Sequence, residues 1–229
     1  MKEKNLKKVF LIVGIVAAAL YLVGFLISTG ISLFSSSYIT GSLVLSNLWA
    51  LTKAFVLYGF VLAFFIYEMV KKSDKKDRVI NIILFVVFCL LALSCISSIF
   101  NRINTLVKAA YYLNGLTIVS YIIDILNGIL RIGLFVLFGI NTIFLVLSKS
   151  KAAKILTFII IGLIALVFLN SILSTILLLI GKTNVRLIFI SLGSLFNGFS
   201  LSVFQASLAY IIYDKLKGLE KKNSSDKAK

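Results

Sequence analysis

The chain has 229 residues, of which 60% are hydrophobic and 14% are charged, and its formal net charge is +16. Soluble domains contain roughly 45–50% apolar and about 25% charged residues, so this composition excludes an ordinary soluble protein. Histidine and proline are both absent, which removes the imidazole base and the commonest zinc ligand from its chemistry. The sequence predicts an integral membrane protein with no cofactor and no metal site.

Six apolar stretches follow one another along the chain, and each is long enough to cross a bilayer, for which about 20 residues suffice. Lipid cannot satisfy open backbone groups, and the alternating pattern of a barrel is absent, so all six should be helical. They cover residues 9–34, 43–70, 79–100, 116–147, 155–180 and 187–213. We predict an all-α integral membrane protein: a basic segment at 1–8, a single six-helix transmembrane bundle at 9–213, and a disordered basic tail at 214–229.

The polar segments between the stretches alternate in charge. Eighteen of the 24 Lys and Arg residues lie in one set of alternating segments and four in the other. The basic set comprises residues 2–8, 71–78, 149–154 and 215–229, and the weakly charged set comprises 35–42, 101–115 and 181–186. The positive-inside rule places both termini in the cytoplasm of a multi-pass protein of the cell membrane. The high net charge is thereby explained by topology, and no nucleic-acid partner is expected.

Polar residues recur at equal distances from the basic segments, which predicts three repeated helical hairpins. Three serines stand 20 residues after the basic residue that opens each hairpin, and three further polar residues stand 18 residues before the lysine that closes it. The first set is Ser28, Ser98 and Ser174, and the second is Lys53, Arg131 and Asn197. The alternative is that any spanning helix becomes polar where it leaves the membrane.

Seven polar side chains within the apolar stretches are candidate ligand-binding residues: Lys53, Asp124, Arg131, Asn141, Asn170, Asn197 and Gln205. Asp124 is expected to pair with Arg131 or Lys53 near the outer interface. That pair either fixes helix register or belongs to an outward-facing cationic pocket for a carboxylate, a phosphate or a lipid headgroup. The amides of Asn141 and Gln205 lie near the bilayer middle, where they either join helices or bind a substrate.

Small residues recur every four positions in the sixth stretch and form a ridge that allows another helix to approach closely. The ridge consists of Ser194, Gly198, Ser202 and Ala206, and Gly14 with Ala18 forms a shorter version in the first stretch. The ridge either packs within the bundle or docks against a membrane-protein partner or a second copy of the chain.

The polar and small residues described above bear on three classes of function: an enzyme, a ligand-capturing membrane component and an accessory subunit. We predict that the protein is not an enzyme, because the apolar stretches hold no paired carboxylates and the chain contains no nucleotide-binding or nucleophile-elbow motif. The leading hypothesis is a transport-related or substrate-capturing membrane component that binds a small or anionic ligand, or a lipid, in the outer half of the bundle. The alternative is a non-transporting accessory, assembly or immunity subunit that docks on another membrane protein.

Overall fold

The computed structural model describes residues 2–35, 41–71, 77–109, 115–147, 150–180 and 185–226. These residues form six α-helices: α1 (Lys2–Ser35), α2 (Gly41–Val70), α3 (Asp77–Ala109), α4 (Gly115–Val146), α5 (Ser150–Leu179) and α6 (Val185–Asp226). Each helix contains a candidate membrane span of 27–32 residues. The prediction of an all-α protein with six spanning helices in one bundle is confirmed.

Three helices, α1, α3 and α6, extend by seven or more residues past the apolar stretches from which they were predicted. α1 begins at Lys2, and α6 continues to Asp226, where the sequence analysis expected a disordered tail from residue 214. Leu216 is fully buried and Leu219 packs against the core, so the last part of α6 is anchored beyond its apolar stretch. Hydropathy marks only the segment that lipid accepts, whereas backbone hydrogen bonding continues wherever good helix formers such as Lys, Leu and Glu follow.

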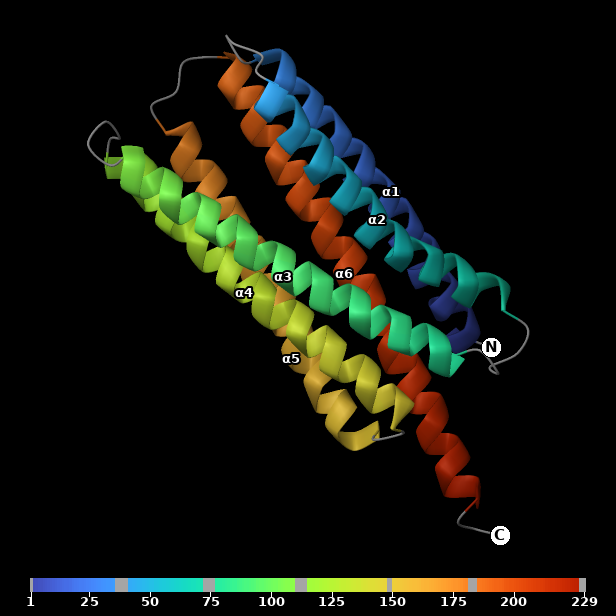
Figure 1. Ribbon diagram of the computed structural model, residues 1–229. Helices are drawn as coiled ribbons and strands as arrows, with labels where there is room; N and C mark the ends of the chain where they lie inside the picture. Colours follow the sequence, from blue (N-terminus) through green and yellow to red (C-terminus); the bar gives the residue numbers. More distant parts are fainter. Residues whose placement is uncertain are drawn as a thin grey trace.

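The six helices form two groups of three (Figure 1). One group contains α1, α2 and α6, and the other contains α3, α4 and α5. α6 joins the groups because it packs against α1 on one side and α5 on the other, whereas α2 and α3 make few contacts. Within the 18-residue apolar window of its span, half of the residues of α6 are buried, against 22–39% in the corresponding windows of the other five helices. α6 is therefore the central helix of the bundle.

Each group has its own aromatic core. Phe65 of α2 and Phe204 of α6 are buried with ring centroids 5.4 Å apart. Phe88 of α3 stacks on Phe138 of α4 at 5.2 Å. Large buried aromatic side chains contribute much of the packing area in such a core, so each of the two groups has internal contacts that hold its helices together.

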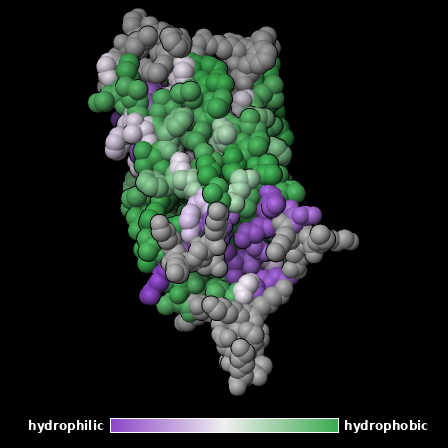
Figure 2. Space-filling view, turned by 90° about the vertical axis from the view of Figure 1, so that its right-hand side faces the viewer, coloured by the Kyte–Doolittle hydropathy of each residue, from purple (hydrophilic) through white to green (hydrophobic). Residues whose placement is uncertain are grey.

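The outer surface suits a lipid environment. Large apolar side chains are exposed on all six helices, and Figure 2 shows them covering most of one face, with hydrophilic side chains gathered toward the lower end. At that end α1 begins and α6 leaves the bundle, and Lys7, Lys71 and Lys215 lie together there. We call it the basic end, and we call the other the opposite end.

A polar cavity between the two helix groups

A cavity of about 490 Å³ lies in the half of the bundle away from the basic end. Side chains from α1, α3, α4, α5 and α6 line it, and α2 contributes none. Its lining is rich in hydroxyl groups, which come from Ser28, Ser98, Ser171, Ser174, Thr175, Ser191 and Ser194. Two arginines, one aspartate and two asparagines complete its polar lining, and Tyr21, Phe25, Ile99 and Leu201 are among its larger apolar residues. The cavity thus combines polar groups with an apolar surface, as small-molecule sites do.

The polar residues that recur in the three predicted hairpins gather at this cavity. Ser28, Ser98, Ser174, Arg131 and Asn197 all line it. Lys53, the sixth member of the set, lies on α2 outside the cavity lining. Its ammonium group sits 5.8 Å from the ring centroid of Trp49 on the same helix, which is a cation–π contact.

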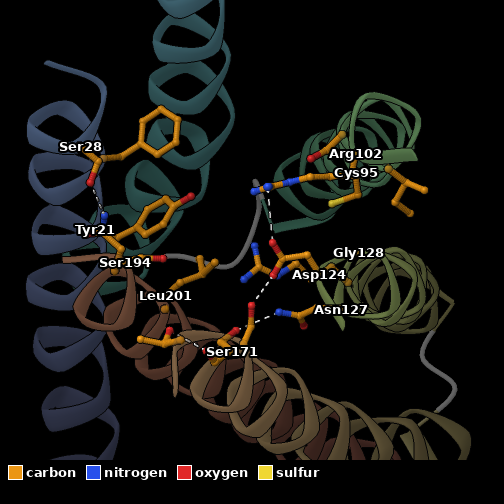
Figure 3. A pocket seen from close by; sticks show the side chains of 18 of the residues that line it. Tyr21, Ser28, Cys95, Arg102, Asp124, Asn127, Gly128, Ser171, Ser194 and Leu201 are labelled. Carbon is orange, nitrogen blue, oxygen red and sulfur yellow. Dashed lines mark hydrogen bonds and ion pairs between the residues drawn. The ribbon is translucent and has the colours of Figure 1, made fainter. Parts of the chain in front are cut away.

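Arg102 and Asp124 form an ion pair at the cavity. The guanidinium Nη1 of Arg102 lies 3.5 Å from Oδ2 of Asp124, and Ser174 donates a hydrogen bond of 2.8 Å to Oδ1. Figure 3 shows Arg102 of α3 and Asp124 of α4 directed toward each other. The expected pairing of Asp124 with Arg131 or Lys53 is therefore not the one that forms. α3 and α4 are consecutive antiparallel helices, so the last turns of α3 lie beside the first turns of α4.

Arg131 carries the positive charge that remains in the cavity. Its Nε is buried without a hydrogen-bond partner, and the carboxylate of Asp124 is already paired with Arg102. In the part of the chain that the structure describes, no carboxylate lies within ion-pair distance of Arg131. Two guanidinium groups and one carboxylate leave the cavity with a single uncompensated positive charge, which favours a bound anion.

Two asparagines connect the helices around the cavity. Asn127 Nδ2 donates to Ser171 Oγ at 2.9 Å and joins α4 to α5, while Asn197 Nδ2 donates to Ser28 Oγ at 3.1 Å and joins α6 to α1. The Oδ1 atom of each amide is buried without a hydrogen-bond partner. In Asn197 this oxygen fills the space above Gly24, where a Cβ atom would collide with it. Asn127 was not among the predicted candidates, although this residue stands one helical turn from Arg131 on the same face of α4.

Besides Lys53, three of the predicted candidates lie outside the cavity lining. Asn141 is fully buried and donates to Thr157 Oγ1 at 2.9 Å, so it joins α4 to α5 as the helix-joining interpretation expects. Asn170 is half-buried on α5. Gln205 of α6 is buried, and both polar atoms of its amide lack a hydrogen-bond partner. The structure thus brings Asp124, Arg131 and Asn197 together and leaves Lys53, Asn141, Asn170 and Gln205 elsewhere.

Within the small-residue ridge of α6, Gly198 lies against α5. A Cβ atom on Gly198 would lie 3.7 Å from Cβ of Ser171 on α5, and Ser202 donates to the Gly198 carbonyl. Ser194 and Gly198 both line the cavity. On α1, Gly14 lies so close to α2 that a Cβ atom there would collide with the ring of Phe65, and Ala18 is buried in the core. These contacts favour packing within the bundle over docking on a partner.

A second polar cluster, at the basic end, was not predicted from the sequence. The side chain of Glu68 is fully buried, and Oε1 lies 2.5 Å from Nζ of Lys215. Its Oε2 lies 3.3 Å from Lys71 and 3.6 Å from Lys7. The signal that could have revealed it is that Glu68 is the one acidic residue in the apolar stretch 43–70.

Two aspartates complete this cluster. Asp77 lies 2.7 Å from Lys71 and 3.3 Å from Lys215 and accepts a hydrogen bond from Tyr67, while Asp214 lies 3.2 Å from Lys7. Three lysines and three carboxylates therefore balance one another. They come from α1, α2, α3 and α6, so the cluster joins the two helix groups at the basic end.

The chain matches no protein-family model, no curated protein sequence and no solved structure. The sequence and the geometry above support a six-span membrane protein that contacts the lipid bilayer, with a polar cavity at one end and an ion-pair cluster at the other.

Proposed function

We propose that the protein is a substrate-capturing component of a membrane transport process, and that its cavity binds a small anion or an anionic headgroup. The observation that carries this proposal is the position of Arg131, whose Nε is buried in the cavity wall without a partner. An uncompensated charge inside a membrane protein is costly, so such groups commonly mark a ligand or ion site. The role is binding and not catalysis.

The dimensions of the cavity support a small-molecule ligand. Its volume of about 490 Å³ falls in the range of roughly 300–1,000 Å³ typical of small-molecule sites. Ser28, Ser98 and Ser194 are exposed, so the lining includes groups that are accessible from outside. A ligand can therefore reach Arg131 without unfolding a helix.

We propose further that both termini face the cytoplasm and that the cavity opens toward the outer side of the cell membrane. The excess of Lys and Arg on the segments at the basic end supports this orientation. The test is labelling of intact cells with a membrane-impermeant maleimide, starting from a variant with Cys89→Ala and Cys95→Ala. Ser37→Cys should be labelled in intact cells, and Ser224→Cys only after lysis. The reverse pattern would contradict the orientation.

Native mass spectrometry of the protein extracted gently from its own membranes tests the binding function. We expect a retained anionic small molecule or lipid that is lost in Arg131→Gln. Lys53→Gln is the matched control, because it removes the same charge from a lysine outside the cavity lining and should leave the ligand in place. Loss of the ligand in both variants, or in neither, would contradict the assignment to Arg131. A stoichiometric protein partner without any ligand would favour the accessory-subunit alternative.

A further inference from the structure

Two residues on one face of α4, Arg131 and Asn127, line the cavity, and each has a buried polar atom without a partner. Arg131 Nε is a donor and Asn127 Oδ1 is an acceptor, and both are buried without a hydrogen bond. Asn127 is only 7% exposed. The two residues are four positions apart, so they lie on the same face of α4 with a rise of about 6 Å between them. Arg131 Nε lacks an acceptor, whereas Asn127 Oδ1 lacks a donor.

The neighbouring hydroxyl groups do not meet these requirements. Ser171 accepts from Asn127 Nδ2 and donates to the Val167 carbonyl, and Ser174 donates to Asp124. Each of these hydroxyl protons is therefore already used within the bundle. Asn127 Oδ1 is therefore free to accept a hydrogen bond from a donor of a bound molecule, which would relieve the cost of a buried acceptor without a donor.

The uncompensated positive charge at Arg131 sets a second requirement, that the ligand carries an anionic group. Because Arg102 and Asp124 compensate each other at 3.5 Å, the cavity has room for one negative charge, at Arg131. A simple fatty acid would pair with Arg131 but would leave Asn127 Oδ1 without a donor. A neutral sugar would satisfy Asn127 and leave Arg131 uncompensated. A ligand that satisfies both residues carries an anionic group and a donor on the same molecule.

We propose, building on the binding function above, that the ligand is a monoanion that also carries a hydroxyl or N–H donor. Its carboxylate or phosphate binds Arg131, and its donor bonds to Asn127 Oδ1. Tyr21 and Leu201, which also line the cavity, contact its carbon skeleton. Two sources supply this chemistry: a free acid that carries a hydroxyl or amide N–H group, and a lipid whose phosphodiester headgroup carries hydroxyl groups.

The test uses pairs of anions that differ in their donors. For free acids, gluconate is compared with hexanoate by calorimetric titration of the purified protein, and 4-hydroxybutyrate is compared with butyrate, so that the charge is the same within each pair. For lipids, phosphatidylglycerol is compared with phosphatidylethanol, which has the same charge and no headgroup hydroxyl, by native mass spectrometry from nanodiscs that contain equal amounts of both. We expect the donor-bearing member of one arm to bind about tenfold more tightly, and the arm that shows this preference identifies the source.

Substitutions test whether Asn127 produces the preference for the donor-bearing anion. Asn127→Leu should abolish the preference and leave the hydroxyl-free anion bound as before, whereas Asn170→Leu, outside the cavity lining, should retain it. Ser171→Ala removes the internal partner of Asn127 but keeps Oδ1, so it should also retain the preference. The comparison of paired anions on the unmodified protein remains decisive if Asn127→Leu does not fold.

The outcomes separate this inference from the function on which it rests. Equal binding of both members of every pair, with loss of both in Arg131→Gln, would overturn the requirement for a donor and leave the anion-binding function intact. Binding of no anion in either arm would overturn both. A preference that survives Asn127→Leu would also overturn the role of Asn127.

Discussion

The two ends of the bundle use charge in different ways. In the cluster at the basic end, three lysines surround Glu68, Asp77 and Asp214, so every charge of the cluster has a partner of opposite sign. In the cavity, the pairing of Arg102 with Asp124 leaves Arg131 without a carboxylate. Both groups of charges include residues within candidate spans, yet only the cluster at the basic end is balanced within itself.

The difference separates structural charges from candidate binding charges. A buried charge with its partners in place holds helices together, and removal of one partner is strongly unfavourable because it leaves the others uncompensated. A charge that lacks a partner in the ligand-free protein costs stability, and a bound ligand recovers it. Mutations at the two ends should therefore have effects of different size and, for Arg131, of a different kind.

The largest expected effect is at the centre of the basic-end cluster. Glu68→Gln removes the fully buried carboxylate and leaves three lysines to share Asp77 and Asp214, which should destabilise the bundle by about 3–5 kcal/mol. The measurement is the temperature at which the protein in detergent loses its monodisperse size-exclusion peak. A double-mutant cycle with Lys215→Gln should show strong coupling, and additive effects would contradict a direct Glu68–Lys215 interaction.

A smaller effect is expected where α1 packs against its neighbours. Gly24→Ala places a methyl group against Asn197 beside the cavity, and Gly14→Ala places one against Phe65. Each should cost about 1–3 kcal/mol through overpacking. Gly30→Ala is the matched control on the same helix, because its Cβ atom would meet nothing within 4 Å. If Gly24→Ala is as well tolerated as Gly30→Ala, helix packing does not hold the opposite end together.

A single hydrogen bond within the second helix group should contribute less. Asn141→Leu removes the bond to Thr157 that joins α4 to α5 and should cost about 1 kcal/mol, the usual value for a hydrogen bond between membrane helices. Thr157 retains its bond to the Ala153 carbonyl, so no hydroxyl is left without a partner. The same thermal measurement, with Asn170→Leu as the control, checks this value. Loss of ligand binding in Asn141→Leu would show that the residue acts at the cavity.

The smallest effect on stability is expected at Arg131. In the ligand-free protein, Arg131→Gln should not lower stability and should raise it slightly, because no carboxylate loses a partner and an uncompensated charge is removed. The thermal stabilisation that a bound anion provides should disappear completely in this variant. A large loss of stability without ligand would show that Arg131 is structural and would remove the contrast between the two ends.

Local sequence patterns predicted the fold well, because every spanning helix must satisfy its own backbone and present apolar side chains to lipid. The ends of α1, α3 and α6 were harder to predict, since these helices continue into residues beyond the apolar stretches. The last turns of α6 illustrate this, because Leu216 and Leu219 hold them against the core.

The candidate site was predicted only in part. The number of residues from the basic segments, which estimates depth in the membrane, indicated Asp124, Arg131 and Asn197. All three line the cavity. The same residue count also indicated Lys53, because the distance of a residue from the end of its helix does not show toward which neighbour its side chain points. Glu68 and Arg102 were missed because their importance depends on partners from other helices, which a single sequence does not specify.

The position of α2 outside the cavity wall has a consequence for spectroscopy. The one tryptophan of the chain, Trp49, stands on this helix with 62% of its surface exposed. Its fluorescence will respond to the surrounding lipid, so brominated acyl chains should quench it. The emission should stay constant during a ligand titration, which makes Trp49 a built-in depth marker that the bound anion leaves undisturbed.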